Sequence, residues 1–127
     1  MKIKLSSVFV DDQDKALKFY TEVLGFVKKL DIPMGAAKWL TVVSSDELNG
    51  TELLLEPNGN PAAKTYQEAI FGQGIPATAF EVKAIQAEYK RLKELGVTFR
   101  TEPEKMGEVT AAIFDDTCGN LIQIYQV

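Results

Sequence analysis

Apolar and polar positions divide the first half of the chain into a strand, a helix and three further strands. An extended run over 3–10 leads into acidic residues and then into apolar residues at helical spacing, which predict a helix over 13–24. Asp12 is placed to cap the start of this helix, and Gly25 is a natural stop at its end. Three strands are expected next, over 26–30, 38–43 and 51–56, with turns over 31–35 and 44–50.

The same order of elements returns in the second half. A loop over 57–61 leads into a short connector with a helical pattern over 62–71, which glycines and a proline close. A strand, a helix that stops at Gly96 and three more strands are expected, over 77–82, 85–95, 97–101, 108–114 and 121–126. Lys83 and Ala84 offer this second helix no acidic cap, so we expect it to begin less firmly than the first.

The two halves correspond closely enough to indicate an internal duplication. Val10 falls on Val82 and Gly25 on Gly96, and the second half is one residue shorter between these points. A chain of 127 residues has room for one compact domain. We therefore predict a single domain over 1–127, with a first module over about 1–60, a connector over about 61–76 and a second module over about 77–127.

Composition and charge exclude several classes of protein. Hydrophobic residues make up 46% and charged residues 25%, a balance that argues against a disordered or fibrous chain. The net charge is −4 and no basic cluster exceeds Lys28-Lys29, so nucleic acid is not an expected partner. No stretch has the pattern of a signal peptide or a membrane span, so we expect a cytoplasmic protein that does not engage a membrane. The absence of histidine removes the most common general base and metal ligand.

Three segments of the chain resemble one known family. Residues 9–26 (FVDDQDKALKFYTEVLGF) are similar to the opening motif of the vicinal oxygen chelate superfamily, 92–97 to its second helix exit, and 116–124 to its closing turn and strand. That superfamily includes glyoxalase I, extradiol dioxygenases, and the fosfomycin and bleomycin resistance proteins. The resemblance implies an α+β fold of two βαβββ modules, each curling a mixed sheet into half of an open barrel around the ligand. It also implies a homodimer.

Strand alternation, combined with this resemblance, predicts which side chains face the ligand. Under the helices we expect Val8, Val10, Leu53 and Leu55, then Thr78, Phe80, Val82, Ile122 and Ile124. Toward the cavity we expect Leu5, Ser7, Phe9, Glu52, Leu54 and Glu56, then Ala77, Ala79, Glu81, Leu121, Gln123 and Tyr125, with Trp39 on the side opposite to Leu40 and Val42. The candidate ligand-binding residues are Ser7, Phe9, Trp39, Glu52, Leu54, Ala79, Glu81, Gln123 and Tyr125.

Several of these candidates have an ordinary alternative role. The carboxylates of Glu52, Glu56 and Glu81 either attract a cationic guest, form an oxygen-only metal site, or lie solvated at strand ends. Trp39 either stacks on a ligand or packs at a core edge. Arg100 either pairs with an acid or binds an anionic ligand.

The resemblance also implies where a metal would bind. Metal-dependent members place ligands at one position on the first and fourth strands of each module, and those positions here are Leu5, Leu54, Ala77 and Gln123. A catalytic metal needs about three protein ligands, and only Gln123 has a donor oxygen. We therefore expect neither a metal nor another cofactor.

The sequence and the resemblance together favour a metal-free protein that binds or sequesters a small organic molecule in the concave cavity. The alternative is a lyase, isomerase or dioxygenase of the same superfamily, which uses cavity carboxylates or a displaced divalent metal. A third possibility is a structural or regulatory dimer with a filled cavity. The residues identify neither the ligand nor any catalytic group.

Overall fold

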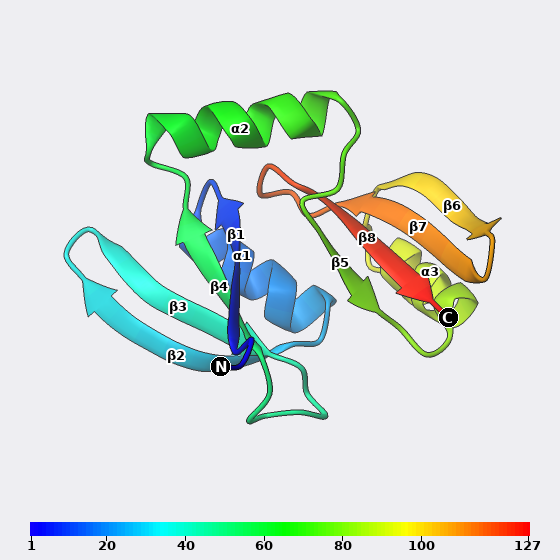
Figure 1. Cartoon of the computed structure of the whole chain (residues 1–127), viewed down its shortest axis with the longest axis horizontal. Coiled ribbons are helices and arrows are strands. Elements are labelled where there is room, and N and C mark those ends of the chain that lie inside the picture. The colour runs from blue at the N-terminus through cyan, green and yellow to red at the C-terminus, as the bar shows by residue number, and fades with distance from the viewer. The chain divides into compact units, whose positions relative to one another are not determined.

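The computed structural model describes residues 1–127, which form two compact units, Met1–Thr65 and Tyr66–Val127 (Figure 1). The first unit contains β1 (Leu5–Val10), α1 (Gln13–Lys18), a π-helical segment η1 (Phe19–Val23), β2 (Val27–Met34), β3 (Ala37–Val43) and β4 (Glu52–Pro57). The boundary between the units falls within α2 (Pro61–Gly72). The second unit continues with β5 (Thr78–Glu81), α3 (Ile85–Glu94), β6 (Phe99–Met106), β7 (Val109–Asp115) and β8 (Leu121–Gln126). None of these helices has the length and apolar character that crossing a membrane requires.

Each unit contains one four-stranded mixed sheet, and the two sheets have the same topology. The strand orders are β1-β4-β3-β2 and β5-β8-β7-β6, and neither sheet closes into a barrel. In both units the first and fourth strands pair in parallel, and the remaining neighbours are antiparallel. The predicted α+β fold of two βαβββ modules is therefore confirmed.

One helix covers one face of each sheet. In the first unit α1 packs on β3 and β4, and Ala16 and Tyr20 are fully buried. In the second unit α3 packs on β6, β7 and β8 through the buried side chains of Ile85 and Leu92. We call the other side of each sheet, which its own helix does not cover, the open face.

The duplication extends to a β-bulge near the start of each edge strand. The pairing register shifts between Lys28 and Leu30 in β2, and between Phe99 and Thr101 at the corresponding place in β6. A threonine hydroxyl accepts a backbone N–H across each bulge, from Leu30 to Thr41 at 3.2 Å and from Ile113 to Thr101 at 3.0 Å. Both modules thus satisfy the backbone at the bulge with the same chemistry.

Two strands are longer than the sequence pattern predicts. The expected turn over 31–35 is wrong, because β2 continues through Pro33 to Met34, and β6 likewise runs beyond 101 to Met106. Both are edge strands, where proline is tolerated because one side of the strand has no ladder partner. The hairpins turn instead at Gly35 and Gly107, whose φ angles of 67° and 68° favour glycine.

The first helix also departs from the predicted regular helix over 13–24. It is α-helical only to Lys18 and then widens into η1, where the N–H of Leu24 donates to the carbonyl of Phe19, five residues back. At the equivalent place in α3, the N–H of Leu95 donates to the carbonyl of Arg91, four residues back. The π-helical turn therefore accommodates the extra residue that distinguishes the first half from the second.

The two helices begin as the sequence predicts. A side-chain oxygen of Asp12 accepts the N–H of Lys15 at 3.0 Å, whereas Ala84 provides no side-chain cap. The structure supplies a substitute from β8, because Oε1 of Gln126 accepts the N–H of Ile85 at 2.8 Å. The second helix is thus held at its start by the sheet rather than by its own cap.

A buried polar network fixes the turn between β7 and β8 to α2. The fully buried carboxylate of Asp116 accepts the backbone N–H groups of Cys118 and Asn120 and the side-chain amide of Asn120. Nε2 of Gln67 on α2 donates to Oδ1 of Asn120 and to the carbonyl of Cys118. Cys118 itself is buried, which agrees with a structural role.

Candidate functional site

The open face of the first unit is arranged in rows that run across its strands. Pairing of β1 with β4 sets Ser7 beside Leu54, and pairing of β4 with β3 sets Leu54 beside Thr41. Phe9 pairs with Glu56, and Leu5 pairs with Glu52, in the rows on either side. Because side chains alternate along a strand, all the predicted residues of this unit lie on one face.

Trp39 lies on the same open face as Phe9 and Glu56. It lies two residues before Thr41 on β3, as Glu56 lies two residues after Leu54 on the antiparallel β4. The half-buried Trp39 forms no hydrogen bond and no ring contact through its indole. The open face therefore carries the Glu56 carboxylate with Phe9 directly beside it and Trp39 on the adjacent strand.

Thr41 fixes the orientation of Glu52 on this face. The Thr41 hydroxyl, which is 0% exposed, donates to Oε1 of Glu52 at 2.7 Å and accepts the N–H of Leu30. The Glu52 carboxylate is half-buried and has no cationic partner within the chain. Sequence reasoning placed Glu52 on this face but missed the hydrogen bond that holds it.

The strands β3 and β4 separate next to Trp39. Their paired register covers only Thr41 with Leu54 and Val42 with Leu53. Beyond it, Nε2 of Gln13 donates to the carbonyls of Lys38 and Leu55, each at 2.8 Å, and Oε1 of Gln13 accepts the N–H of Lys38. The side-chain amide of Gln13, at the start of α1, thus replaces the backbone hydrogen bonds between β3 and β4 next to Trp39.

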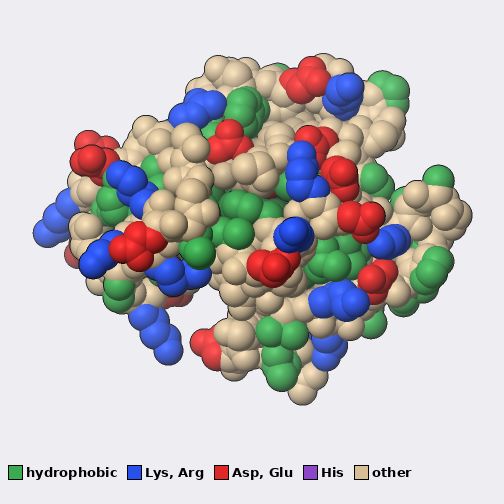
Figure 2. All heavy atoms as spheres, turned by 180° about the vertical axis from the view of Figure 1, so that it is seen from behind, with side chains coloured by type: hydrophobic (Ala, Val, Ile, Leu, Met, Phe, Trp, Pro, Cys, Tyr) green, Lys and Arg blue, Asp and Glu red, His purple; other side chains and the backbone are tan.

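Several lysines of the first unit interact with groups other than the carboxylates of Glu52 and Glu56. Nζ of Lys38 donates to Asp14 at 2.8 Å, and that hydrogen bond raises the pKa of Lys38. Lys28 pairs with Asp31, and Lys29 donates to the loop that contains Asn49. On the surface seen from behind, basic and acidic side chains are intermixed (Figure 2). Neither Glu52 nor Glu56, by contrast, has a basic side chain within ion-pair distance.

The second unit brings its own predicted residues onto one face. Ala79 pairs with Gln123 and Glu81 with Tyr125 in the parallel β5–β8 register. Glu81 is exposed at the last position of β5, as the strand-end alternative describes.

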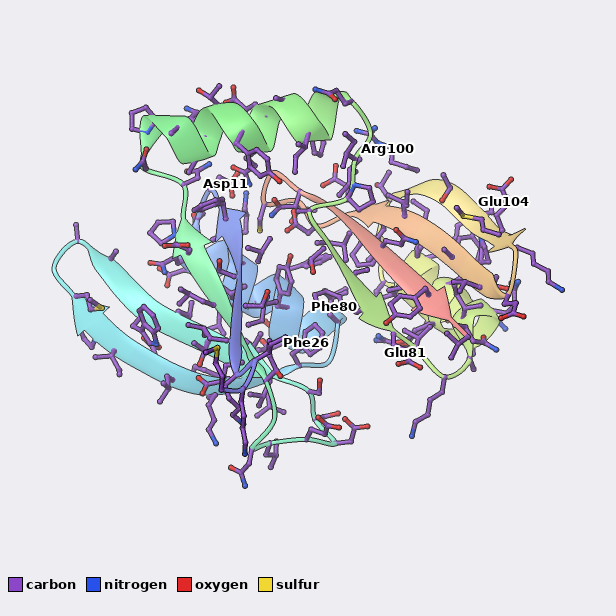
Figure 3. The ribbon with its side chains drawn as sticks, viewed as in Figure 1. Asp11, Phe26, Phe80, Glu81, Arg100 and Glu104 are labelled. Atoms are coloured by element: carbon purple, nitrogen blue, oxygen red, sulfur yellow. The ribbon has the colours of Figure 1, made fainter.

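Arg100 does not pair with an acid. Its guanidinium lies over the ring of Phe71, 5.0 Å from the ring centroid, and Figure 3 shows its side chain well apart from Glu81. The arginine is therefore held by a cation–π contact within the second unit.

Two residues that were expected to line the cavity are buried, and Leu121 of the second unit, at 1% exposed, is one of them. Leu54, a predicted ligand-binding residue, is only 6% exposed. Together with Thr41 it contributes to the core at this face, while Trp39, Glu52 and Glu56 remain partly accessible.

The donor set does not fit the metal site that the family resemblance implies. Leu5, Leu54 and Ala77 have no side-chain donor atom, and Gln123 offers only a neutral amide. No three His, Cys, Asp or Glu side chains are grouped as metal ligands would be. The residues at these positions therefore give no basis for a step through a metal.

Comparison with known proteins identifies the family. The model of the Glyoxalase/Bleomycin resistance protein/Dioxygenase superfamily matches residues 2–124. The chain belongs to this superfamily. It is 68% identical to the uncharacterized protein YurT of Bacillus subtilis (strain 168) over 126 residues, which cover 99% of each chain.

Two solved structures of glyoxalase-like fold are similar over nearly the whole chain. The crystal structure of UcmS2 matches with a TM-score of 0.84 at 34% identity, covering 98% of this chain and 97% of that one. TnmS3, described as an antibiotic binding protein from Streptomyces sp. CB03234, matches with a TM-score of 0.79 at 28% identity, covering 99% and 95%.

Proposed function

We propose that this member of the glyoxalase/bleomycin resistance superfamily binds a small organic molecule on the open face of its first unit, without a metal. The observation that carries the proposal is the presence of Phe9, Glu56 and Trp39 on one open face. The Trp39 indole has no hydrogen-bond or ring partner within the chain, and the Glu56 carboxylate has no cationic partner there. Tryptophan in such a position offers a large apolar surface and a free N–H donor to a ligand.

The antibiotic-binding relative supports the same conclusion. TnmS3 shares the fold and 28% of aligned residues, and its description names antibiotic binding. We extend small-molecule binding, though no particular antibiotic, to this chain. The candidate residues Ser7, Phe9, Trp39 and Glu52 would contact the molecule on the open face of the first unit. The open face of the second unit, taken by itself, carries the candidates Ala79, Glu81, Gln123 and Tyr125.

A thermal-shift screen against antibiotics and metabolites tests this function. A ligand that binds only the native state raises Tm with concentration, in proportion to ln(1 + [L]/Kd). We expect at least one compound to do so, and Trp39→Ala to remove the shift. Tyr66→Ala, which removes an exposed aromatic side chain on α2, serves as the matched control and should retain it. A broad panel without a single concentration-dependent shift would contradict the proposal.

We also propose that the protein is a homodimer. The edge strand β2 exposes Ile32 at 48% and Met34 at 59%, which is an apolar edge that a second copy would cover. Light scattering at micromolar concentration should give about twice the mass of one 14.1 kDa chain. A stable monomer would contradict this assembly.

A further inference from the structure

The set of Phe9, Glu56 and Trp39 on the open face has a chemistry more specific than general small-molecule binding. Phe9 and Glu56 are register partners on the parallel strands β1 and β4, and neighbouring strands lie about 4.7–4.9 Å apart. Trp39 lies on the same face of the adjacent strand β3, beyond the last paired residues of β3 and β4. One carboxylate therefore has Phe9 directly beside it and Trp39 on the adjacent strand of the same face.

No basic group of the chain satisfies this carboxylate. The four ion pairs of the structure join Lys15 to Asp11, Lys28 to Asp31, Lys38 to Asp14 and Arg91 to Glu88. Glu56 takes part in none of them, and it accepts no side-chain hydrogen bond. Lys38 is the neighbour of Trp39 in sequence, but its ammonium group is directed to Asp14 on the helix-covered side.

A half-buried carboxylate without a counter-charge attracts a cation when a ligand displaces its water. Aromatic faces attract the same cations through their quadrupole, and tryptophan does so best. The neighbouring row adds no competing positive charge, because it consists of Ser7, Leu54 and Thr41. Carboxylate and aromatic rings therefore favour the same class of guest.

We infer that the ligand of this site is an organic cation, an amine-bearing molecule with an apolar or aromatic body, whose charged nitrogen binds at Glu56 between Phe9 and Trp39. This inference rests on the proposed function, because it specifies the ligand class for the same face. The ammonium group donates to the Glu56 carboxylate, and the body of the ligand lies against the tryptophan.

Three compounds that share a phenylalkyl frame but carry a positive, no or a negative charge test the inference. 4-Phenylbutylammonium, 4-phenylbutan-1-ol and 4-phenylbutanoate differ only at the end group. The protein has a single tryptophan, so the emission of Trp39 reports binding at this site directly. We expect the cation to bind about tenfold more tightly than the alcohol, and the anion least tightly.

Charge variants test whether Glu56 causes the preference for the cation over the alcohol. Glu56→Gln should bring the cation down to the affinity of the alcohol, and Glu56→Lys should shift the preference to the anion. Glu22→Gln, which removes an exposed carboxylate from η1, changes the net charge equally and should leave the preference intact.

Two results would overturn the inference. One is equal binding of the cation and the alcohol, or no binding of the cation at all, to the unmodified protein. The other is a cation preference that survives Glu56→Gln. Either result leaves the proposed function standing if other compounds still raise Tm in the screen, whereas an empty screen removes the proposed function itself.

Discussion

The hydroxyl of Thr41 donates a 2.7 Å hydrogen bond to Oε1 of Glu52, across the antiparallel strands β3 and β4. The hydroxyl oxygen of Thr41 also accepts the N–H of Leu30 at the bulge of β2. A single fully buried side chain therefore connects three strands of the first sheet and orients a carboxylate on its open face. The bulge in β2 and the orientation of Glu52 therefore both depend on Thr41.

Replacing Thr41 by valine tests this connection. Thr41→Val keeps the shape but leaves the N–H of Leu30 without its acceptor, which should lower the free energy of unfolding by about 1–3 kcal/mol. Thr41→Ser retains the hydroxyl and should recover most of that loss. Urea unfolding of the three proteins measures the difference. Equal stability of the valine and serine variants would show that the hydroxyl is unimportant.

Gln13 gives a second prediction, because its amide substitutes for strand pairing near Trp39. Gln13→Glu removes the donor to the carbonyls of Lys38 and Leu55 and places a charge against them, so we expect a loss of about 2–3 kcal/mol. The emission of Trp39 should shift at the same time. Gln86→Glu, at an exposed position of α3, is the matched control. An unchanged spectrum and stability in Gln13→Glu would refute this role.

Local pattern was sufficient to predict the repeated order of elements, because each module repeats its own strand alternation, helical spacing and glycine stops, whereas the fold was implied by the family resemblance. Asp12 and Ala84 show this at single residues, since the expected cap and its expected absence are both present. The site could be predicted only as far as the face, which follows from a two-residue period. The π-helical turn, the Gln13 bridge and the Thr41–Glu52 bond depend on how elements distant in sequence pack. Among these, only the π-helical turn has a counterpart in the sequence, the extra residue of the first half, and the predicted regular helix over 13–24 did not use it.

The starts of α1 and α3 give a third prediction, in which the N-cap of α1 is removed and an N-cap is added to α3. Asp12→Ala removes the acceptor for the N–H of Lys15 and should cost about 1 kcal/mol. Ala84→Asp should gain a similar amount, because α3 has no side-chain cap while Gln126 already holds the N–H of Ile85. Thermal unfolding of both variants checks the opposite signs. Two shifts of the same sign would contradict this explanation.

A fourth prediction concerns the turn between β7 and β8. Gly119 has a φ of 100°, and a Cβ there would lie 2.7 Å from Nε2 of Gln67. Gly119→Ala should therefore destabilise the protein by about 2–4 kcal/mol, through backbone strain and disruption of the buried network. Gly59→Ala, where a Cβ meets open space, should change stability little. A Gly119→Ala protein as stable as the Gly59→Ala protein would contradict the role of the network.

The most direct test of small-molecule binding on the open face of the first unit is a paired titration. A compound selected by thermal shift is titrated into the protein, once in a calorimeter and once while the emission of Trp39 is recorded. Binding at this face predicts a saturable change in Trp39 emission with the same Kd as the calorimetric isotherm. Calorimetric binding with an unchanged Trp39 emission would place the ligand elsewhere and contradict the account.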